Sequence, residues 1–196
     1  MRVRSIVWGA TLASAAAIVG RAAIGTREGP AVDAELFSLV NRGGGRGMDR
    51  YFLGITELGS LYAAAAAAGA LALTGHRRAA ASALGAAGAT WTLGQGAKKL
   101  VRRPRPYEAE PDATRRLIAR PAGTSWPSSH PAVLTTFTRV AARELGLGAG
   151  SRVALAALDV SVAVSRSYVG VHYPSDVSSG LLLGRAVARL WPGRHR

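Results

Sequence analysis

The chain has 196 residues, which suffices for one domain with a substantial core, whereas two domains would be cramped. Its formal net charge of +14 requires an anionic partner or surface, and because the basic residues alternate with apolar runs, lipid head groups fit this layout better than nucleic acid. The absence of cysteine excludes disulfides and thiolate metal sites, and the sequence therefore does not indicate whether the protein works in an oxidising or a reducing compartment.

Apolar residues make up 48% of the chain and charged residues 18%, which is drier than the average soluble domain. Much of the apolar content is Ala and Gly, which let membrane helices approach closely. Residues 5–25 are predicted to form a first spanning helix; a signal peptide is the alternative, which the later apolar stretches disfavour. Residues 26–51 predict a short interfacial helix that ends at the glycines of NRGGG.

Two further spanning helices are predicted at 52–74 and at about 79–97, joined by a tight turn. They are followed by a polar loop with several prolines, residues 98–130, which is the longest hydrophilic stretch of the chain. Loops of this length without structure of their own are usually functional. We therefore expect this loop to carry part of a site.

The rest of the chain contains three more candidate spans, and the first of these is weakened by the charges of Arg139, Arg143 and Glu144. These candidates are 131–147, 153–168 and 175–191. No β alternation and no internal repeat is visible. The expected fold is all-α: a polytopic membrane helix bundle of about six transmembrane helices, forming a single domain over residues 1–196.

Three clusters of polar residues lie at the ends of predicted helices. In KKLVRRPRP, Lys98 and Arg105 are seven residues apart, about two helical turns, so both are expected on the same side of a helix. The other clusters are PSSH, residues 127–130, and SRSYVGVHYPSD, residues 165–176. With six spans, all three clusters fall on one face of the membrane.

The residues of these clusters suit phosphoryl transfer. They include two histidines, an aspartate, several cations and a serine, and they show no metal-ligand pattern. In that reaction fixed cations stabilise charge spread over three oxygens while a nucleophile attacks in line. His172 is the candidate nucleophile. Pro174 suits the first position of a helix, which places Asp176 in the first turn, where its carboxylate would orient the imidazole. His130 remains to protonate the leaving oxygen.

These motifs resemble the three signatures of the type 2 phosphatidic acid phosphatase family, which are integral-membrane lipid phosphatases. The matching patterns are K-x6-RP from Lys98, PSSH, and SR-x5-H-x3-D from Ser165 to Asp176. Motif order and helix layout agree as well, so the resemblance covers most of the chain from about residue 30. Each motif alone is weak, but the three together and in order are specific.

The resemblance implies a reaction that needs no metal or other cofactor. His172 would attack phosphorus to form a phosphohistidine and Asp176 would hold its ring, while His130 would protonate the leaving group and then activate water. The phosphate oxygens would be held by Lys98, Arg105, Arg166, the Ser128 hydroxyl and the backbone N–H of Ser129. The family usually has Gly at the position of Ser129, a change that is tolerable if the φ angle of Ser129 is ordinary.

The expected function is hydrolysis of a phosphomonoester or diphosphate on a lipid carrier. Candidate substrates are polyprenyl diphosphate, a polyprenyl-linked sugar phosphate, phosphatidylglycerol phosphate and phosphatidic acid, and no motif selects among them. The Ala, Gly and Arg bias hints at a high-GC bacterium, in which polyprenyl carriers feed wall synthesis. The alternatives are a non-enzymatic basic membrane protein that binds anionic lipid or nucleic acid, and a vanadate-dependent haloperoxidase. The membrane spans argue against the latter, and the oligomeric state is not predicted.

Several charged residues are placed outside the expected site. Arg102 and Arg103 are interpreted as head-group contacts or solvated charge, and Arg115 as part of a basic rim. Asp159, in the fifth span, is expected to be a structural partner for an arginine such as Arg139 or Arg185.

The expected location is the inner membrane of a bacterial cell, with several spans. The positive-inside rule counts seven Lys and Arg residues on the face of the two termini and thirteen on the catalytic face. Charge alone would put the catalytic face in the cytoplasm. The resemblance instead implies an extracytoplasmic site, which is the orientation we predict.

Overall fold

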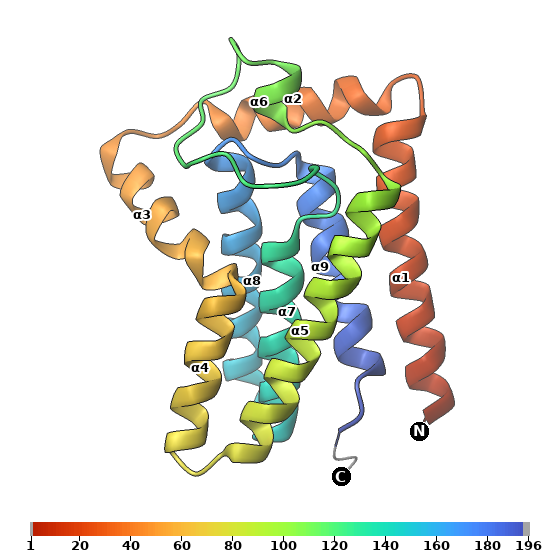
Figure 1. Ribbon diagram of the computed structural model, residues 1–196, viewed down its shortest axis with the longest axis vertical. Helices are drawn as coiled ribbons and strands as arrows, with labels where there is room; N and C mark the ends of the chain where they lie inside the picture. Colours follow the sequence, from red (N-terminus) through yellow and green to blue (C-terminus); the bar gives the residue numbers. More distant parts are fainter. Residues whose placement is uncertain (1, 194–196) are drawn as a thin grey trace.

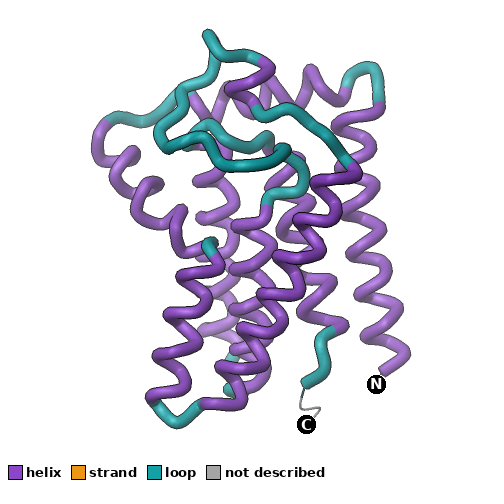
Figure 2. Tube along the Cα trace, viewed as in Figure 1, coloured by secondary structure: helices purple, strands orange, loops and turns teal. Residues whose placement is uncertain are grey.

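The computed structural model describes residues 2–193 and consists of helices joined by turns and loops. No strand occurs within that part of the chain (Figure 2). The longer helices run side by side (Figure 1). They are α1 (Arg2–Gly25), α4 (Leu61–Leu73), α5 (Arg77–Leu100), α7 (Ser129–Glu144), α8 (Ala149–Tyr168) and α9 (Pro174–Leu190). The start of α1 and the end of α9 lie at the end of the bundle away from the longest loop (Figure 1). The predicted all-α class is confirmed.

Two shorter helices, α2 (Gly29–Asn41) and α3 (Arg46–Thr56), connect α1 to the rest of the bundle. α2 lies across the end of the bundle (Figure 1), and it is the helix predicted to end at the glycines of NRGGG. Gly43 and Gly45 have φ angles of 88° and 84°, a conformation that favours glycine. The glycines therefore end α2 and let the chain turn into α3.

The continuous helix predicted over 52–74 is wrong. α3 ends at Thr56, a 3-10 turn covers Glu57–Gly59, and α4 then leaves at an angle of 70° to the preceding segment. Ser60 starts α4, because its hydroxyl accepts a hydrogen bond from the Ala63 N–H (3.1 Å). A Cβ atom on Gly59 would lie 2.7 Å from the Cβ of His130, so the break allows close contact with α7.

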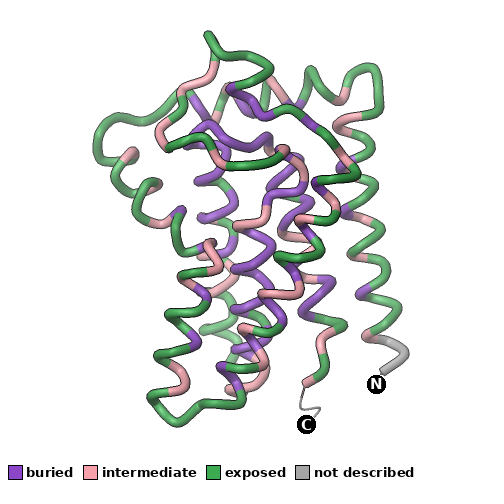
Figure 3. Tube along the Cα trace, in the orientation of Figure 1, coloured by how far each residue is buried: buried purple, intermediate pink, exposed green. Residues whose placement is uncertain are grey.

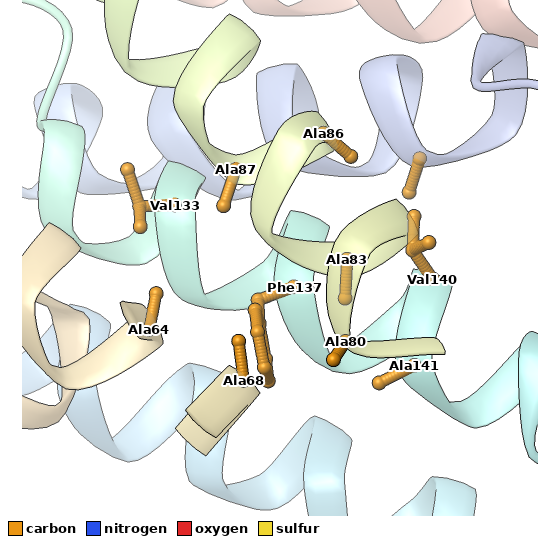
Figure 4. Packing of buried hydrophobic residues seen from close by; sticks show 11 residues of the cluster. Ala64, Ala68, Ala80, Ala83, Ala86, Ala87, Val133, Phe137, Val140 and Ala141 are labelled. Atoms are coloured by element: carbon orange, nitrogen blue, oxygen red, sulfur yellow. The ribbon is translucent and has the colours of Figure 1, made fainter. Parts of the chain in front are cut away.

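The other predicted helices correspond to α5, α7, α8 and α9, with ends that differ by a few residues. Small side chains form the interface of α4, α5 and α7, where Val133, Phe137 and Val140 meet a layer of alanines (Figure 4). The alanines of α4 and α5 in this cluster are Ala64, Ala68, Ala80, Ala83, Ala86 and Ala87. Because alanine has no side chain beyond Cβ, the helices approach closely there.

The helices differ in how many of their residues are buried. Buried residues concentrate in α7, α9 and the loop beside them, whereas α1 and α3 are largely exposed (Figure 3). Exposed side chains include large apolar ones, such as Trp8 and Ile18 on α1. An apolar outer surface of this kind suits contact with lipid.

The number of spanning helices is not confirmed. Within residues 2–193, Ser5–Gly25 is long and apolar enough to cross a membrane. The bent pair Arg46–Gly59 and Leu61–Leu73 passes the same test if it is counted as one span. α7 and α9 carry arginines along their second halves, which lowers their hydropathy.

Gly180 tests the contact between α9 and the loop before α7. A Cβ atom there would lie 2.4 Å from the Ser128 carbonyl oxygen, whereas one on Gly69 of α4 would meet nothing within 4 Å. We expect Gly180→Ala to lower the free energy of unfolding by about 1–3 kcal/mol through overpacking. Thermal melting in detergent measures the change, and Gly69→Ala is the control. Equal melting temperatures of the two variants would contradict this contact.

Candidate active site

A cavity of about 720 Å³ opens at the end of the bundle that carries the long loop. Six of the residues singled out from the sequence line it: Lys98, Arg105, Ser129, His130, Arg166 and His172. They come from α5, α7, α8 and the connecting loops. Stretches that are far apart in the sequence therefore meet around a single space. Apolar residues, including Leu61, Leu84 and Trp91, supply much of the remaining wall.

His172 lies in the loop between α8 and α9 and is only 3% exposed. Its Nε2 is 3.3 Å from Arg105 Nη1. Because a guanidinium can only donate, Nε2 must accept, and the ring proton is assigned to Nδ1. The lone pair of Nε2 consequently points toward the cations of the cavity.

Asp176 supports the other side of the His172 ring, partly through a serine. Pro174 occupies the first position of α9 and Asp176 lies in its first turn, as predicted. The carboxylate Oδ2 is 3.7 Å from His172 Nδ1, which is longer than a hydrogen bond. The Ser125 hydroxyl donates to Asp176 Oδ2 (2.5 Å) and lies 3.4 Å from His172 Nδ1. Ser125 thus bridges the two, a role that the sequence did not reveal.

Lys98 and Arg105 line the cavity together, but the predicted reason is wrong. α5 ends at Leu100, so the two residues do not share a helix. Backbone carbonyls hold them instead: Lys98 Nζ donates to Thr124 O (2.6 Å). The Arg105 guanidinium donates to Gly123 O (2.9 Å), Val171 O (2.9 Å) and Ala122 O (3.2 Å).

Arg166 is 2% exposed, and its Nη1 donates to the Thr56 hydroxyl (2.6 Å) at the end of α3. Its Nε is buried and has no hydrogen-bond partner among residues 2–193. A buried cation with an unused donor beside a cavity is suited to an anionic ligand.

Ser128 and Ser129 differ in their position relative to the cavity. Ser129 is the first residue of α7, lines the cavity and has an ordinary negative φ angle, as the tolerance of Ser at this position requires. Ser128 is fully buried and does not line the cavity. Its hydroxyl has no hydrogen-bond partner in the described part of the chain, and its N–H donates to Asp176 O (3.1 Å).

The interpretation of Arg103 as a solvated charge or a head-group contact is wrong. It is 7% exposed and forms ion pairs with Asp176 Oδ1 (2.7 Å) and Asp33 Oδ2 (2.6 Å). The Ser175 hydroxyl also donates to Asp33, and the Ser175 N–H donates to Asp33 Oδ1 (3.0 Å). Asp33 belongs to α2, so this network ties α2 to the start of α9. In the sequence, the signal for this network was limited to an acidic residue, Asp33, on the face of α2 that also carries Phe37 and Asn41.

Arg115 also differs from expectation. It is not simply part of a rim, because it pairs with Asp49 of α3 (3.0 Å) and its N–H donates to Asn41 Oδ1 (2.7 Å). Asp159 accepts a hydrogen bond from the Thr138 hydroxyl (3.0 Å). It interacts electrostatically with Arg139 and Arg185, the two arginines expected as its partners, although no direct ion pair forms among residues 2–193.

The charges around the cavity are arranged for an anion. Lys98, Arg105 and Arg166 face it, whereas the carboxylate of Asp176 is turned toward Arg103 and Ser125. Burial lowers the pKa of His172 well below its ordinary value, and the positive charges of Arg105, Lys98 and Arg166 lower it further. The imidazole is therefore neutral near pH 7, the form that acts as a nucleophile.

Comparison with known proteins gives a consistent family and fold. A family model described as "PAP2 superfamily" matches residues 78–195. Two curated relatives from Mycobacterium tuberculosis, strains CDC 1551 / Oshkosh and ATCC 25618 / H37Rv, are named decaprenylphosphoryl-5-phosphoribose phosphatase. Each is 38% identical over 93 residues, which is 47% of this chain and 48% of the relative. The match thus spans about half the length of these relatives.

Two solved structures have a similar fold. The crystal structure of Aquifex aeolicus LpxE has a TM-score of 0.71 at 25% identity, covering 79% of this chain and 90% of that one. A transmembrane PAP2 type phosphatidylglycerolphosphate phosphatase from Bacillus subtilis has a TM-score of 0.72 at 22% identity, covering 95% and 91%. The helix arrangement of the whole bundle therefore recurs in solved structures.

The Arg103 network predicts a large loss of stability when its cation is removed. Arg103→Met leaves Asp33 and Asp176 buried without their partner, which should cost about 3–5 kcal/mol. Thermal melting in detergent measures this, and the neighbouring exposed Arg102→Met is the control, expected to stay within about 0.5 kcal/mol. A similar small effect at both positions would show that the network does not hold the fold.

The lowered pKa of His172 can be measured directly. A lowered pKa means that the ring keeps its proton only at a pH below the ordinary value of about 6.5. Magnetic resonance of isotope-labelled histidine, assigned with His172→Ala, should show a neutral His172 at pH 6.5. In Arg105→Gln the pKa should rise, and in Arg102→Gln, which alters an exposed cation, it should not. A His172 ring that is protonated at pH 6.5 in the parent protein would refute this electrostatic description.

Proposed function

Because the chain belongs to the PAP2 superfamily, we propose that it is an integral-membrane phosphatase that hydrolyses a phosphate ester of a lipid. The observation that carries this proposal is the meeting of Lys98, His130, Arg166 and His172 around one cavity. These residues come from three sequence clusters, and the bundle brings them together. The whole chain acts in this proposal as a single membrane-embedded domain, with 26–51 at the interface and 98–130 as the active-site loop.

In the first step, His172 Nε2 attacks the phosphorus atom. Its lone pair faces the cavity, and Asp176, assisted by Ser125, steadies the positive charge that develops on the ring. The bond between phosphorus and the leaving oxygen breaks, and His130 gives that oxygen a proton. The products of this step are a phosphohistidine and a lipid alcohol, or a lipid monophosphate when the substrate is a diphosphate.

In the second step, His130 takes a proton from water, which attacks phosphorus. The phosphorus–nitrogen bond breaks, and inorganic phosphate leaves with His172 neutral again. Lys98, Arg105 and Arg166 stabilise the oxygens of both transition states, together with the N–H of Ser129 and the Ser128 hydroxyl. Because Ser128 does not line the cavity, its contact requires a small movement of the loop. No step needs a metal ion, and the cations of the cavity wall would repel one.

The wall of the cavity supports a lipid substrate. Leu61, Tyr62 and Trp91 provide apolar surface beside the cations, so a phosphate and the start of a lipid chain fit the same space. Among lipid phosphates we favour a polyprenyl-linked sugar phosphate, because the names of the curated relatives describe such a substrate. Polyprenyl diphosphate and glycerolipid phosphates remain in the test panel.

We further propose that six segments cross the membrane: α1, the bent α3–α4 pair, α5, α7, α8 and α9. The structure changes the charge balance used for orientation, because Arg139, Arg143, Arg185 and Arg189 lie in the last two turns of α7 and α9. Added to the seven that the sequence count assigns to the face of the two termini, these four give eleven, which equals the count for the catalytic face once Lys98 and Arg105 are set aside. The charge count then no longer opposes an extracytoplasmic active site.

The proposal is tested by phosphate release from purified protein in detergent, with EDTA present, across polyprenyl and glycerolipid phosphates. His172→Ala should abolish release because the nucleophile is lost, whereas His76→Ala, in an exposed turn at the other end, should not alter it. Arg166→Ala should raise the barrier by about 3–4 kcal/mol, roughly a hundredfold to a thousandfold in rate.

Two outcomes would refute the proposed mechanism. Full activity of His172→Ala would exclude the proposed nucleophile, and loss of activity with EDTA would exclude a metal-independent reaction. A protein that releases no phosphate from any lipid but binds anionic lipid with a steep salt dependence would be the non-enzymatic basic membrane protein instead.

A further inference from the structure

A second cavity, of about 360 Å³, lies between α7, α8, α9 and the start of α1. Its lining residues belong to the second halves of α7 and α9, the first part of α8 and the start of α1, and these segments lie at the end of the bundle opposite to the long loop (Figure 1). Its wall carries five arginines and one carboxylate: Arg139, Arg143, Arg152, Arg185, Arg189 and Asp159. So strong an excess of one charge around one space is costly without an anion, most of all near a membrane.

Two of these arginines have protein partners. The Arg143 guanidinium donates to the carbonyls of Ala188 (2.9 Å) and Trp191 (3.1 Å), which end α9. Arg152 Nε donates to Leu147 O (2.8 Å). Arg143 therefore stabilises the end of α9 and also pairs with Glu144 (4.0 Å), whereas Arg152 holds the turn between α7 and α8.

The other three arginines are not occupied in this way. Arg139, Arg185 and Arg189 form no side-chain hydrogen bond or ion pair with another residue in the range 2–193. Arg185 Nε is buried without a partner. Asp159 accepts a hydrogen bond from the Thr138 hydroxyl and interacts electrostatically with Arg139 and Arg185 without a direct ion pair, so a single carboxylate of the described chain faces five arginines. Planar guanidinium groups that converge on one space match the oxygens of a phosphate.

An apolar cavity adjoins the basic one. It has a volume of about 370 Å³, shares Ser5 and Arg189 with the basic cavity, and is also lined by Ile6, Leu190 and Trp191. A charged space beside an apolar one resembles the chemistry of a lipid, with its head group and the start of its acyl chain. A free phosphate ion would use only the first space.

We propose that this basic cavity binds the phosphate of an anionic membrane lipid at the end of the bundle opposite to the candidate active site. The proposal does not depend on the phosphatase reaction, because none of the proposed catalytic residues lines this cavity. The lipid supplies negative charge beyond that of Asp159, which alone cannot balance five arginines. It thereby holds together the ends of α7, α8 and α9.

The test measures the melting temperature of the full chain in detergent with added dioleoylphosphatidylglycerol or dioleoylphosphatidylcholine. The anionic lipid should stabilise the parent protein and the zwitterionic lipid should not. In Arg139→Gln/Arg189→Gln, which replaces two exposed side chains without partners in residues 2–193, affinity for phosphatidylglycerol should fall by on the order of tenfold or more. Arg50→Gln/Arg77→Gln removes the same charge from exposed positions outside the cavity and should respond like the parent.

Further measurements distinguish a lipid phosphate from a free phosphate, and the basic cavity from the candidate active site. Inorganic phosphate and glycerol phosphate should stabilise the protein much less than phosphatidylglycerol; an equal effect would overturn the assignment to a lipid. Arg166→Ala, in the candidate active site, should keep the response to phosphatidylglycerol. The proposal is overturned if Arg139→Gln/Arg189→Gln responds like the parent, or if only Arg166→Ala loses the response. Arg185→Gln tests the same cavity with a second variant and should also weaken the response to phosphatidylglycerol.

Discussion

The ion pairs of Arg103 with Asp33 and Asp176 hold the candidate active site in place. A buried cation between two carboxylates is stable only as a set, because the loss of any member leaves an uncompensated charge. The network joins α2, the loop after α5 and the first turn of α9. It also holds the carboxylate of Asp176 in the position from which Ser125 and His172 are oriented. The loop after α5 is therefore held by Arg103, a residue that does not itself line the cavity.

The cations of the cavity serve two compatible purposes. They attract an anion, and together with burial, which is the larger effect, they lower the pKa of His172 and keep its imidazole neutral. Backbone carbonyls hold Lys98 and Arg105, so these cations are positioned without carboxylates that would compete for them. Arg103, by contrast, is fully engaged by carboxylates and serves structure.

The two ends of the bundle use arginine in different ways. At the active-site end the guanidinium of Arg105 is held by three carbonyls, and Arg166 is held by a single hydroxyl. At the other end Arg139, Arg185 and Arg189 line a cavity in which, among the described residues, five arginines share one carboxylate, that of Asp159. An apolar bundle surface between two basic ends is the arrangement expected of a protein that meets phosphates at both membrane faces.

The helical class, most helix positions and the three motifs followed from the amino-acid sequence alone, because apolar periodicity and helix-end signals are local. The sequence also placed Pro174 and Asp176 correctly in the first turn of α9. It did not predict the break at Glu57–Gly59, where Gly59 packs closely against His130. Arg103 was interpreted as solvated because its partner Asp33 lies 70 residues away in the chain. Ser125 and Thr56 carried no signal. Which cations face the cavity depends on ion pairs and carbonyl contacts between distant segments, and such contacts are visible in the packed bundle but not in the sequence.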